Sequence, residues 1–189
     1  MNEKDLILSL QKGDQAAFKL LVETWQNMVF NTVLGIVQDT HEAEDVTQEV
    51  FIQVFQSVGG FRGEAKLSTW LYRIAVTKAL DAERKKKSKK RMANLKSRMG
   101  LGEKEEEAVH FHHPGVQLAN KEKAALLFEA IQKLPGNQRI VFVLIKTEGL
   151  RYDEVADIMN LTIKSVEALV HRAKENLRKY LQNYYSDHD

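Results

Sequence analysis

The chain has 189 residues, enough for one ordinary domain or two small ones, and 43% of them are apolar, which suffices for a core. It contains no cysteine, so disulfides and cysteine-based zinc sites are excluded. The net charge of +2 conceals an uneven distribution: residues 1–58 carry −6, residues 59–92 carry +8 and residues 151–189 carry −1. The surface that would attract a polyanion therefore lies in the middle of the chain.

Long runs of good helix formers and only two prolines indicate an all-α protein. The first residues, MNEKDLILSLQKGD, are acidic and mixed, unlike a secretory signal. The longest purely apolar run, residues 140–145, is far shorter than the roughly 20 residues that span a bilayer. We therefore expect a soluble, cytoplasmic chain with no membrane insertion.

The first part of the chain shows helical periodicity. Apolar residues spaced three and four apart predict a helix over residues 14–38. A second helix is expected to begin after Asp39-Thr40, because acidic residues in its first turn suit the helix dipole, and to run to about Val58. A third is expected from about Ser68 into the lysine run at 85–90.

The composition then changes. Residues 88–119 lack apolar periodicity and are interpreted as a charged linker, flexible or only partly helical. The helical pattern resumes at residues 119–134, stops at Pro135-Gly136 and restarts at Asn137. Two helices after Gly149 have the pattern of a helix-turn-helix. Two small helical domains are therefore predicted, one on each side of the linker, at residues 1–87 and 120–189.

The second predicted helix carries more than a core face. On a helical wheel, Ile52 is exposed within an acidic and amide surface, which suits docking of a basic partner helix. The alternative is a solvated face with one stray isoleucine. The core arc consists of Val46, Val50, Phe51, Val54, Phe55 and Val58, and the opposite face of Asp45, Gln48, Glu49 and Gln56.

Residues 59–87 combine cations with aromatic rings. Cations neutralise phosphates, and a ring stacked on an unpaired base contributes about 1–3 kcal/mol. The glycines of GGFRG allow close approach of the backbone to a ligand. This composition favours single-stranded nucleic acid; the alternative is a surface helix with Trp70 and Tyr72 buried. The candidate residues are Phe61, Arg62, Lys66, Trp70, Tyr72, Arg73 and Lys78.

The stretch ADIMNLTIKSVEALVHRAK, residues 156–174, predicts the helix-turn-helix, with Asn160 in a left-handed turn and Thr162 as N-cap. The core stripe of its second helix is expected to include Ile163, Val166, Leu169, Val170, Ala173, Leu177, Tyr180 and Leu181. The candidate groove-reading residues are Lys164, Glu167, Ala168, His171 and Arg172. A glutamate among them is repelled by phosphate unless it pairs with cytosine, so weak binding to DNA is expected. The alternative is a helical hairpin for protein contact.

In this order of elements the chain resembles bacterial RNA polymerase sigma factors of the extracytoplasmic-function (ECF) type, in the sigma-70 family. EAEDVTQEVFIQVFQ (42–56) is similar to the family's core-polymerase-binding helix. FRGEAKLSTWLYRIA (61–75) is similar to its −10 recognition and melting segment. Residues 134–181 are similar to its −35-binding domain.

The resemblance implies a non-enzymatic subunit without cofactor or metal, which binds core RNA polymerase, promoter DNA and an anti-sigma factor. It implies that Asp45 and Gln48, with Glu49 and Ile52 beside them, meet the coiled coil of the β′ subunit, and that the β subunit is also contacted. It further implies that the loop Phe61–Lys66, which includes Gly63, captures a flipped −10 base. The residues lining that strand would include Trp70, Tyr72, Arg73, Thr77 and Lys78.

Some residues depart from the family pattern. Thr77 stands where many members have Asn, and Glu167-Ala168-Leu169 replaces a commoner Lys-Ser-Arg, so base preferences do not transfer. The linker histidines His110, His112 and His113 match no family motif, and we expect no metal site there.

Two rival functions remain open from the residues. One is an independent helix-turn-helix regulator that binds duplex operators as a dimer. The other is a helical-bundle hydrolase using Glu42, Asp45 and Glu49 with a linker histidine, although no nucleophile–base pair supports it.

Overall fold

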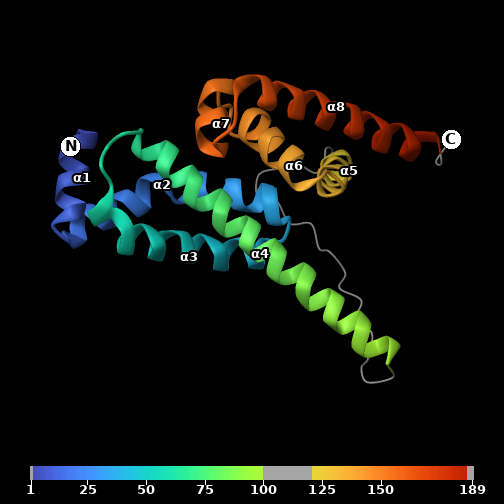
Figure 1. Cartoon of the computed structure of the whole chain (residues 1–189), viewed down its shortest axis with the longest axis horizontal. Helices are drawn as coiled ribbons and strands as arrows, with labels where there is room; N and C mark the ends of the chain where they lie inside the picture. The colour runs from blue at the N-terminus through green and yellow to red at the C-terminus, as the bar shows by residue number, and fades with distance from the viewer. Residues whose placement is uncertain (1, 100–120, 187–189) are drawn as a thin grey trace.

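A computed structural model describes residues 2–99 and 121–186 of the chain (Figure 1). Within these ranges there is no strand, so the predicted all-α class is confirmed. His110, His112 and His113 lie outside the described residues. In the part of the chain that is described, no helix is long and apolar enough to cross a membrane.

The N-terminal unit is built on three long helices. Its elements are α1 (Glu3–Gln11), α2 (Gln15–Val37), α3 (Thr40–Ser57), the short 3₁₀ turn η1 (Val58–Gly60) and α4 (Leu67–Arg98). Side chains cap the starts of the first three helices: for example, the Asp39 carboxylate accepts from the Glu42 amide at 2.9 Å. Gln38 ends α2 in the left-handed conformation, with φ of 61°. Helices α2, α3 and α4 pack against one another around Leu21, Val50 and Leu71, which are fully buried.

The C-terminal unit contains the helix-turn-helix. Its elements are α5 (Lys121–Gln132), α6 (Gly136–Phe142), the π-helical turn η3 (Val143–Thr147), α7 (Tyr152–Met159) and α8 (Ile163–Ser186). As predicted, Asn160 is left-handed, with φ of 52°, and the Thr162 hydroxyl accepts from the Ser165 amide at 3.2 Å. These two residues place α8 across α7, and Val166 and Val170 are buried at the crossing.

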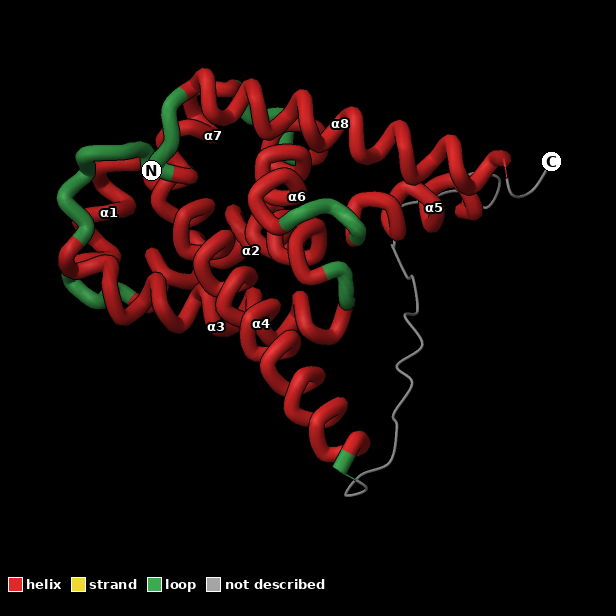
Figure 2. The backbone as a smooth tube through the Cα atoms, turned by 45° about the vertical axis from the view of Figure 1, so that its right-hand side comes forward, coloured by secondary structure: helices red, strands yellow, loops and turns green. Residues whose placement is uncertain are grey.

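The two units pack directly on each other. In Figure 2, α6 and α7 lie over α2 and α4, and one cluster of buried residues runs through both units, from Leu21 to Ile140 and Leu144. Gly35 in α2 makes this approach possible, because a Cβ at this position would lie 2.7 Å from Cγ1 of Val143. A gap that small excludes any side chain, and Val143 is β-branched and buried, so it has little freedom to yield.

Helix α4 is longer than predicted and projects from the body of the molecule (Figure 1). It continues through the lysine run to Arg98, so residues 88–98 of the expected linker are helical, and every residue from 84 to 96 is exposed. No core packing holds this part. Its Lys, Arg, Ala, Met and Leu residues all have high helix propensity, and cations near a helix C-terminus interact favourably with the helix dipole.

Candidate nucleic-acid and partner interfaces

The surface of α3 carries an apolar pair within its acidic face. Ile52 is 56% exposed, as the wheel predicts, and Phe55 is equally exposed. The expectation that Phe55 belongs to the core is wrong: it lies at the edge of the core arc and makes an edge-to-face contact with Phe18, with 5.2 Å between the ring centroids. Asp45, Gln48 and Glu49 are exposed on the same helix. Two neighbouring apolar side chains within carboxylates form a stronger docking surface than one stray isoleucine.

Two of the three carboxylates proposed for a hydrolase are engaged by lysines of α4. Glu42 accepts from Lys86 at 2.9 Å, and Glu49 lies 3.9 Å from Lys78. These pairs bind α3 to α4 and leave little reason for a catalytic role. No group of three or more potential ligands is placed to hold a metal ion among the described residues.

The loop before α4 and the start of α4 each contribute a ring to an aromatic pair. Phe61 and Trp70 have centroids 4.8 Å apart and planes tilted by 33°, and both side chains are half-buried. The Gln11 side chain donates to the Phe61 carbonyl at 2.8 Å, which fixes the start of the loop. Gly63 has φ of +72°, a left-handed conformation that glycine adopts without strain. Arg62 is exposed beside it, so a phosphate can reach a cation next to accessible ring surface.

Tyr72 is covered by the C-terminal unit instead of facing solvent. It is 6% exposed, and its hydroxyl donates to the Glu148 carboxylate at 3.3 Å. Burial raises the pKa of the Tyr72 hydroxyl, and the Glu148 charge raises it further. Burial also raises the pKa of Glu148, against the lowering effect of the hydrogen bond from Tyr72. The pair therefore lies in a poorly solvated contact between the two units.

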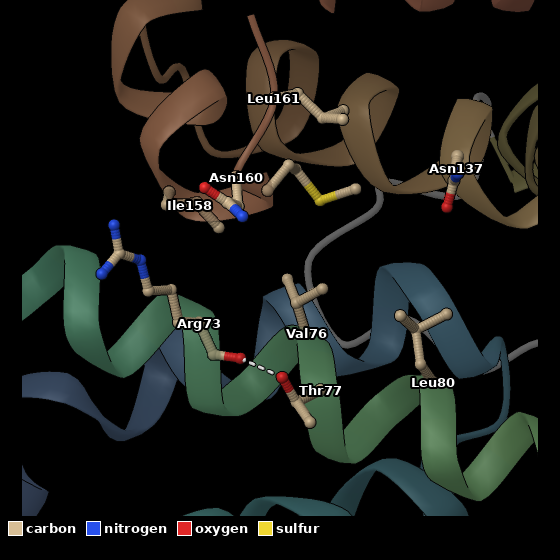
Figure 3. Close-up of a pocket in the computed structure, with 9 residues that line it drawn as sticks. Arg73, Val76, Thr77, Leu80, Asn137, Ile158, Asn160 and Leu161 are labelled. Atoms are coloured by element: carbon tan, nitrogen blue, oxygen red, sulfur yellow. Dashed lines mark hydrogen bonds between the residues drawn. The ribbon is translucent and has the colours of Figure 1, made fainter.

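Arg73 and Lys66 are also held by the C-terminal unit. The Arg73 guanidinium donates twice to the carbonyl of Asp157, at 3.1 and 2.8 Å, and Lys66 lies 3.5 Å from the Glu154 carboxylate. Arg73 lines a groove of about 530 Å³ between α4 and the turn of the helix-turn-helix (Figure 3). Thr77 lines the same groove, with its hydroxyl donating to the Arg73 carbonyl at 2.8 Å. In this arrangement a nucleic-acid strand has no access to the buried Tyr72, whereas Arg73 is exposed but has two of its donor nitrogens bound to Asp157.

The contact that closes the two units was not found from the sequence. Arg139 in α6 is buried and donates to the Ile36 carbonyl at the end of α2, at 2.6 Å, and to the Glu83 carboxylate in α4. It also donates to the carbonyls of Gln132 and Leu134, at 2.8 and 3.2 Å, at the turn before α6. The one available signal was an arginine directly before the apolar run 140–145, a position that calls for buried partners.

The outer face of α8 remains open. Lys164, Glu167, Ala168, His171 and Arg172 are all exposed on it, as the wheel predicts. His171 lies 3.6 Å from Glu175, and the Arg172 guanidinium donates back to the Ala168 carbonyl at 3.3 Å. Ile163, expected in the core stripe, is 47% exposed, because the helix begins there, before it reaches the packed face. This face of α8 can enter a DNA groove even while the two units are packed on each other.

Each of the two units matches a known protein-family model. Residues 21–89 match the family model described as Sigma-70 region 2, and residues 124–177 match Sigma-70, region 4. The chain is 32% identical to the ECF RNA polymerase sigma factor SigW of Bacillus subtilis, over 95% of this chain and 97% of that protein. It is 31% identical to the RNA polymerase sigma-H factor of Pseudomonas aeruginosa, over 95% and 94% of the two chains.

Solved structures share the fold. CnrH in complex with the cytosolic domain of CnrY has a TM-score of 0.69 and 22% identity, over 96% of this chain and 97% of that one. The sigma factor RpoE in complex with the anti-sigma factor NepR, from Bartonella quintana, has a TM-score of 0.62 and 22% identity, over 87% and 96%.

Proposed function

The chain belongs to the ECF type of the sigma-70 family of RNA polymerase sigma factors, and from that premise we propose that it docks on core polymerase through α3 and opens promoters through α4. The observation that carries the proposal is the coexistence of three separate surfaces in one helical chain. These are the apolar pair Ile52 and Phe55 on α3, the stacked rings Phe61 and Trp70, and the exposed reading face of α8. None of the three requires catalysis or a cofactor, and the place of action is the cytoplasm, where the polymerase is.

We assign core binding to the face of α3 that carries Asp45, Gln48, Glu49, Ile52 and Phe55. Its apolar centre supplies buried area and its carboxylates and amide supply orientation toward a basic helix, which suits the coiled coil of the β′ subunit. Contact with the β subunit belongs to the same proposal.

We assign −10 recognition to the segment from Phe61 to Lys78. A base that leaves the stack requires a ring to stack on and a cation for its phosphate, and Phe61, Trp70 and Arg62 supply these at the loop before α4 and the start of that helix. The same assignment covers Gly63, Lys66, Tyr72, Arg73, Thr77 and Lys78. Because Tyr72 and Arg73 are bound to the C-terminal unit here, this arrangement is a closed state that must open before a strand can bind along α4.

Binding to core polymerase separates the two units. When α3 and the C-terminal unit bind separate places on the polymerase, the contacts between α4 and α7 are exchanged for contacts with polymerase and DNA. The recognition helix then binds the −35 duplex intramolecularly, at high effective concentration, so its mixed charge is sufficient. We assign this contact to Lys164, Glu167, Ala168, His171 and Arg172.

The test is run-off transcription with purified core polymerase on a pool of genomic promoters, together with gel shifts of the free chain. The proposal predicts specific transcripts that depend on the chain, and no tight specific shift without core polymerase. Tight operator-like binding by the free chain, without any effect on core polymerase, would instead identify an independent helix-turn-helix regulator.

Control by an anti-sigma factor is part of the proposal. CnrH and RpoE, whose folds this chain shares, were solved with CnrY and with the anti-sigma factor NepR. The groove between α4 and the helix-turn-helix, together with the exposed α3 face, gives such a protein surfaces to cover. Co-purification from native cells tests this: a chain recovered only free or with polymerase would contradict it.

A further inference from the structure

The projecting half of α4 continues the face that lines the groove. Positions 73, 77, 80, 84, 87, 91 and 98 follow one another at steps of three and four, with one step of seven, so they share one side of the helix. The first three are Arg73, Thr77 and Leu80, which line the groove in Figure 3. The last four are Arg84, Lys87, Arg91 and Arg98, and we call them the α4 rail. The C-terminal unit lies against the first part of this side, where Arg73 donates to Asp157, and the rail extends beyond that contact and is exposed.

The charge of this segment is unusual. Residues 84–98 contain nine Lys and Arg and no acidic residue. Arg84 has an exposed ion pair with Asp81 at 3.2 Å, and such a pair is readily exchanged for a phosphate. The exposed Lys87 lies 3.8 Å from Glu83, whose carboxylate also pairs with Arg139. So many like charges on one helix repel each other, and a polyanion would relieve the repulsion and stabilise the helix.

We propose that the α4 rail binds the phosphate backbone of paired promoter DNA next to the melted −10 element. The inference rests on the proposed function for its position on the promoter. The rings Phe61 and Trp70 stand at the first end of α4 and suit unpaired bases, whereas residues 84–98 contain no aromatic residue. Cations without rings can hold the backbone but not an unstacked base, so this half of the helix suits duplex.

The dimensions of the rail fit a duplex. At 1.5 Å per residue, residues 84–98 extend along about 21 Å, which corresponds to about six base pairs at 3.4 Å each. Arg84, Arg91 and Arg98 recur every seven residues, about 10.5 Å apart, or about three base pairs. The junction between melted strand and duplex would therefore lie near the middle of α4, between Thr77 and Arg84. The duplex side is the one toward the −35 element, because the chain leads from Arg98 to the C-terminal unit.

An anionic membrane surface is the alternative partner. Met92, Leu95 and Met99 are exposed, at 60%, 60% and 66%, and lie on one side of the helix, as in a basic interfacial helix. The duplex is favoured because the cations surround the helix on all other sides and no aromatic anchor is present in this segment. The rail is also collinear with the face assigned to the −10 strand.

The first experiment uses the full free chain and a blunt 20-base-pair duplex of non-promoter sequence. Affinity is measured by anisotropy across a salt series. The test variant is Arg91→Gln/Arg98→Gln. The control is Lys89→Gln/Lys96→Gln, which removes the same charge from the same helix, two residues away and about 200° around it.

Loss of two phosphate contacts should lower the salt slope by about 2, and so reduce the loss of affinity between 50 and 200 mM salt by about tenfold. The control should change the slope by less than half as much. If the salt slope changed equally in both variants, the attraction would be diffuse and the proposal for the rail would be wrong. It would also be wrong if the slope changed in neither variant. Circular dichroism checks that the helix persists, since glutamine is a good helix former.

The second experiment uses the holoenzyme formed with core polymerase. One probe has a single-stranded −10 segment joined to a duplex that ends before the −35 element, and the other is the single strand alone. The test variant should weaken binding of the first probe only. Equal weakening of both would assign the rail to the melted strand and overturn the proposal. If the chain fails to bind core polymerase at all, the proposed function fails, and the free-chain experiment still decides the rail.

A third measurement addresses the membrane alternative. The chain is mixed with vesicles of equal parts phosphatidylglycerol and phosphatidylcholine. No binding is expected beyond weak attraction that salt removes equally from both glutamine variants. Salt-resistant binding that Leu95→Ser abolishes would make the helix a membrane element and overturn the assignment to DNA.

Discussion

The guanidinium of Arg139 in α6 and the carboxylate of Glu83 in α4 form an ion pair whose side chains are only 7% and 13% exposed. The same guanidinium caps α2 at the Ile36 carbonyl, so one residue joins the C-terminal unit to two helices of the N-terminal unit. Because a buried charge without its partner is strongly destabilising, we expect this pair to contribute strongly to holding the two units together.

Glu83→Ala is therefore expected to open the chain. Breaking a buried pair costs about 3–5 kcal/mol, and here the loss falls on the closed state alone. The measurement is energy transfer between dyes on Gln56→Cys and Lys174→Cys, which label cleanly because the chain has no cysteine. The matched control is Asp81→Ala, which breaks an exposed pair with Arg84 and should leave the distance unchanged. Equal distances in all three proteins would show that Arg139 does not hold the units together.

Gly35→Ala should have the same effect by a steric route. The new Cβ would lie 2.7 Å from Cγ1 of Val143, so α6 and η3 could not dock, while α2 itself would gain about 0.5–1 kcal/mol from replacing a helical glycine. The double variant Gly35→Ala/Val143→Ala removes the clashing methyl groups and should restore closure. If the Gly35→Ala variant stayed closed, the contact between position 35 and Val143 would have room for a methyl group.

Closure should become more favourable as the pH falls. Burial raises the pKa of Glu148 above its ordinary value of 4.5, whereas opening exposes the carboxyl to water and returns its pKa to about that value. In the window between these two pKa values the closed state holds a proton that the open state has lost, so closing takes up a proton. Glu148→Gln should remove this pH dependence, measured by the same energy transfer. A pH profile identical in both proteins would assign the proton elsewhere.

Ile52→Asp should abolish binding to core polymerase while leaving the helical content intact. A charge placed at the centre of an interface typically removes a hot spot worth about 2 kcal/mol or more. Leu8→Asp is the control, because Leu8 on α1 is just as exposed, at 55%, but lies outside the α3 face. Anisotropy with labelled chain gives both affinities. If Ile52→Asp bound normally, the docking face would have to be sought elsewhere.

Arg172→Ala should weaken use of the upstream promoter element, by about 1–3 kcal/mol if the guanidinium contacts a base. The control, Arg178→Ala, removes an exposed arginine nearly two turns further along α8. Run-off transcription from promoters with intact and scrambled −35 elements separates the two effects. Unaltered selection among these promoters would show that Arg172 contacts no base.

Local signals were sufficient to predict most helices. Periodicity and the acidic first turn of the second helix predicted α2 and α3, and Asn160 with Thr162 predicted the turn between α7 and α8, because these features depend on neighbours in sequence. The short α1 was not predicted, since nine residues of mixed character give little periodicity. Helix α4 exceeds its predicted end because propensity alone continues it after the apolar pattern stops.

The closed arrangement could not be predicted in the same way. It depends on complementarity between distant residues, such as Gly35 with Val143 and Tyr72 with Glu148, and a single sequence contains no signal for such pairs. The same reason explains Phe55: its wheel position lay at the margin of the core arc, and only the packing of α2 determines on which side of that margin it falls. The candidate interface residues were proposed from the chemistry of their residue types, and their roles stay predictions.

At position 35 the closed state has room for a hydrogen atom, and any larger group requires Val143 to shift. Every missense change in that codon adds a carbon where Val143 must fit, yet none of them touches the α3 face, the stacked rings or the outer face of α8. A bacterium under selection for unrestrained expression of the target genes could therefore obtain that expression by a single missense change at Gly35. Suppressor mutations of such an allele should map to Val143, so a plate screen would identify this contact between α2 and η3.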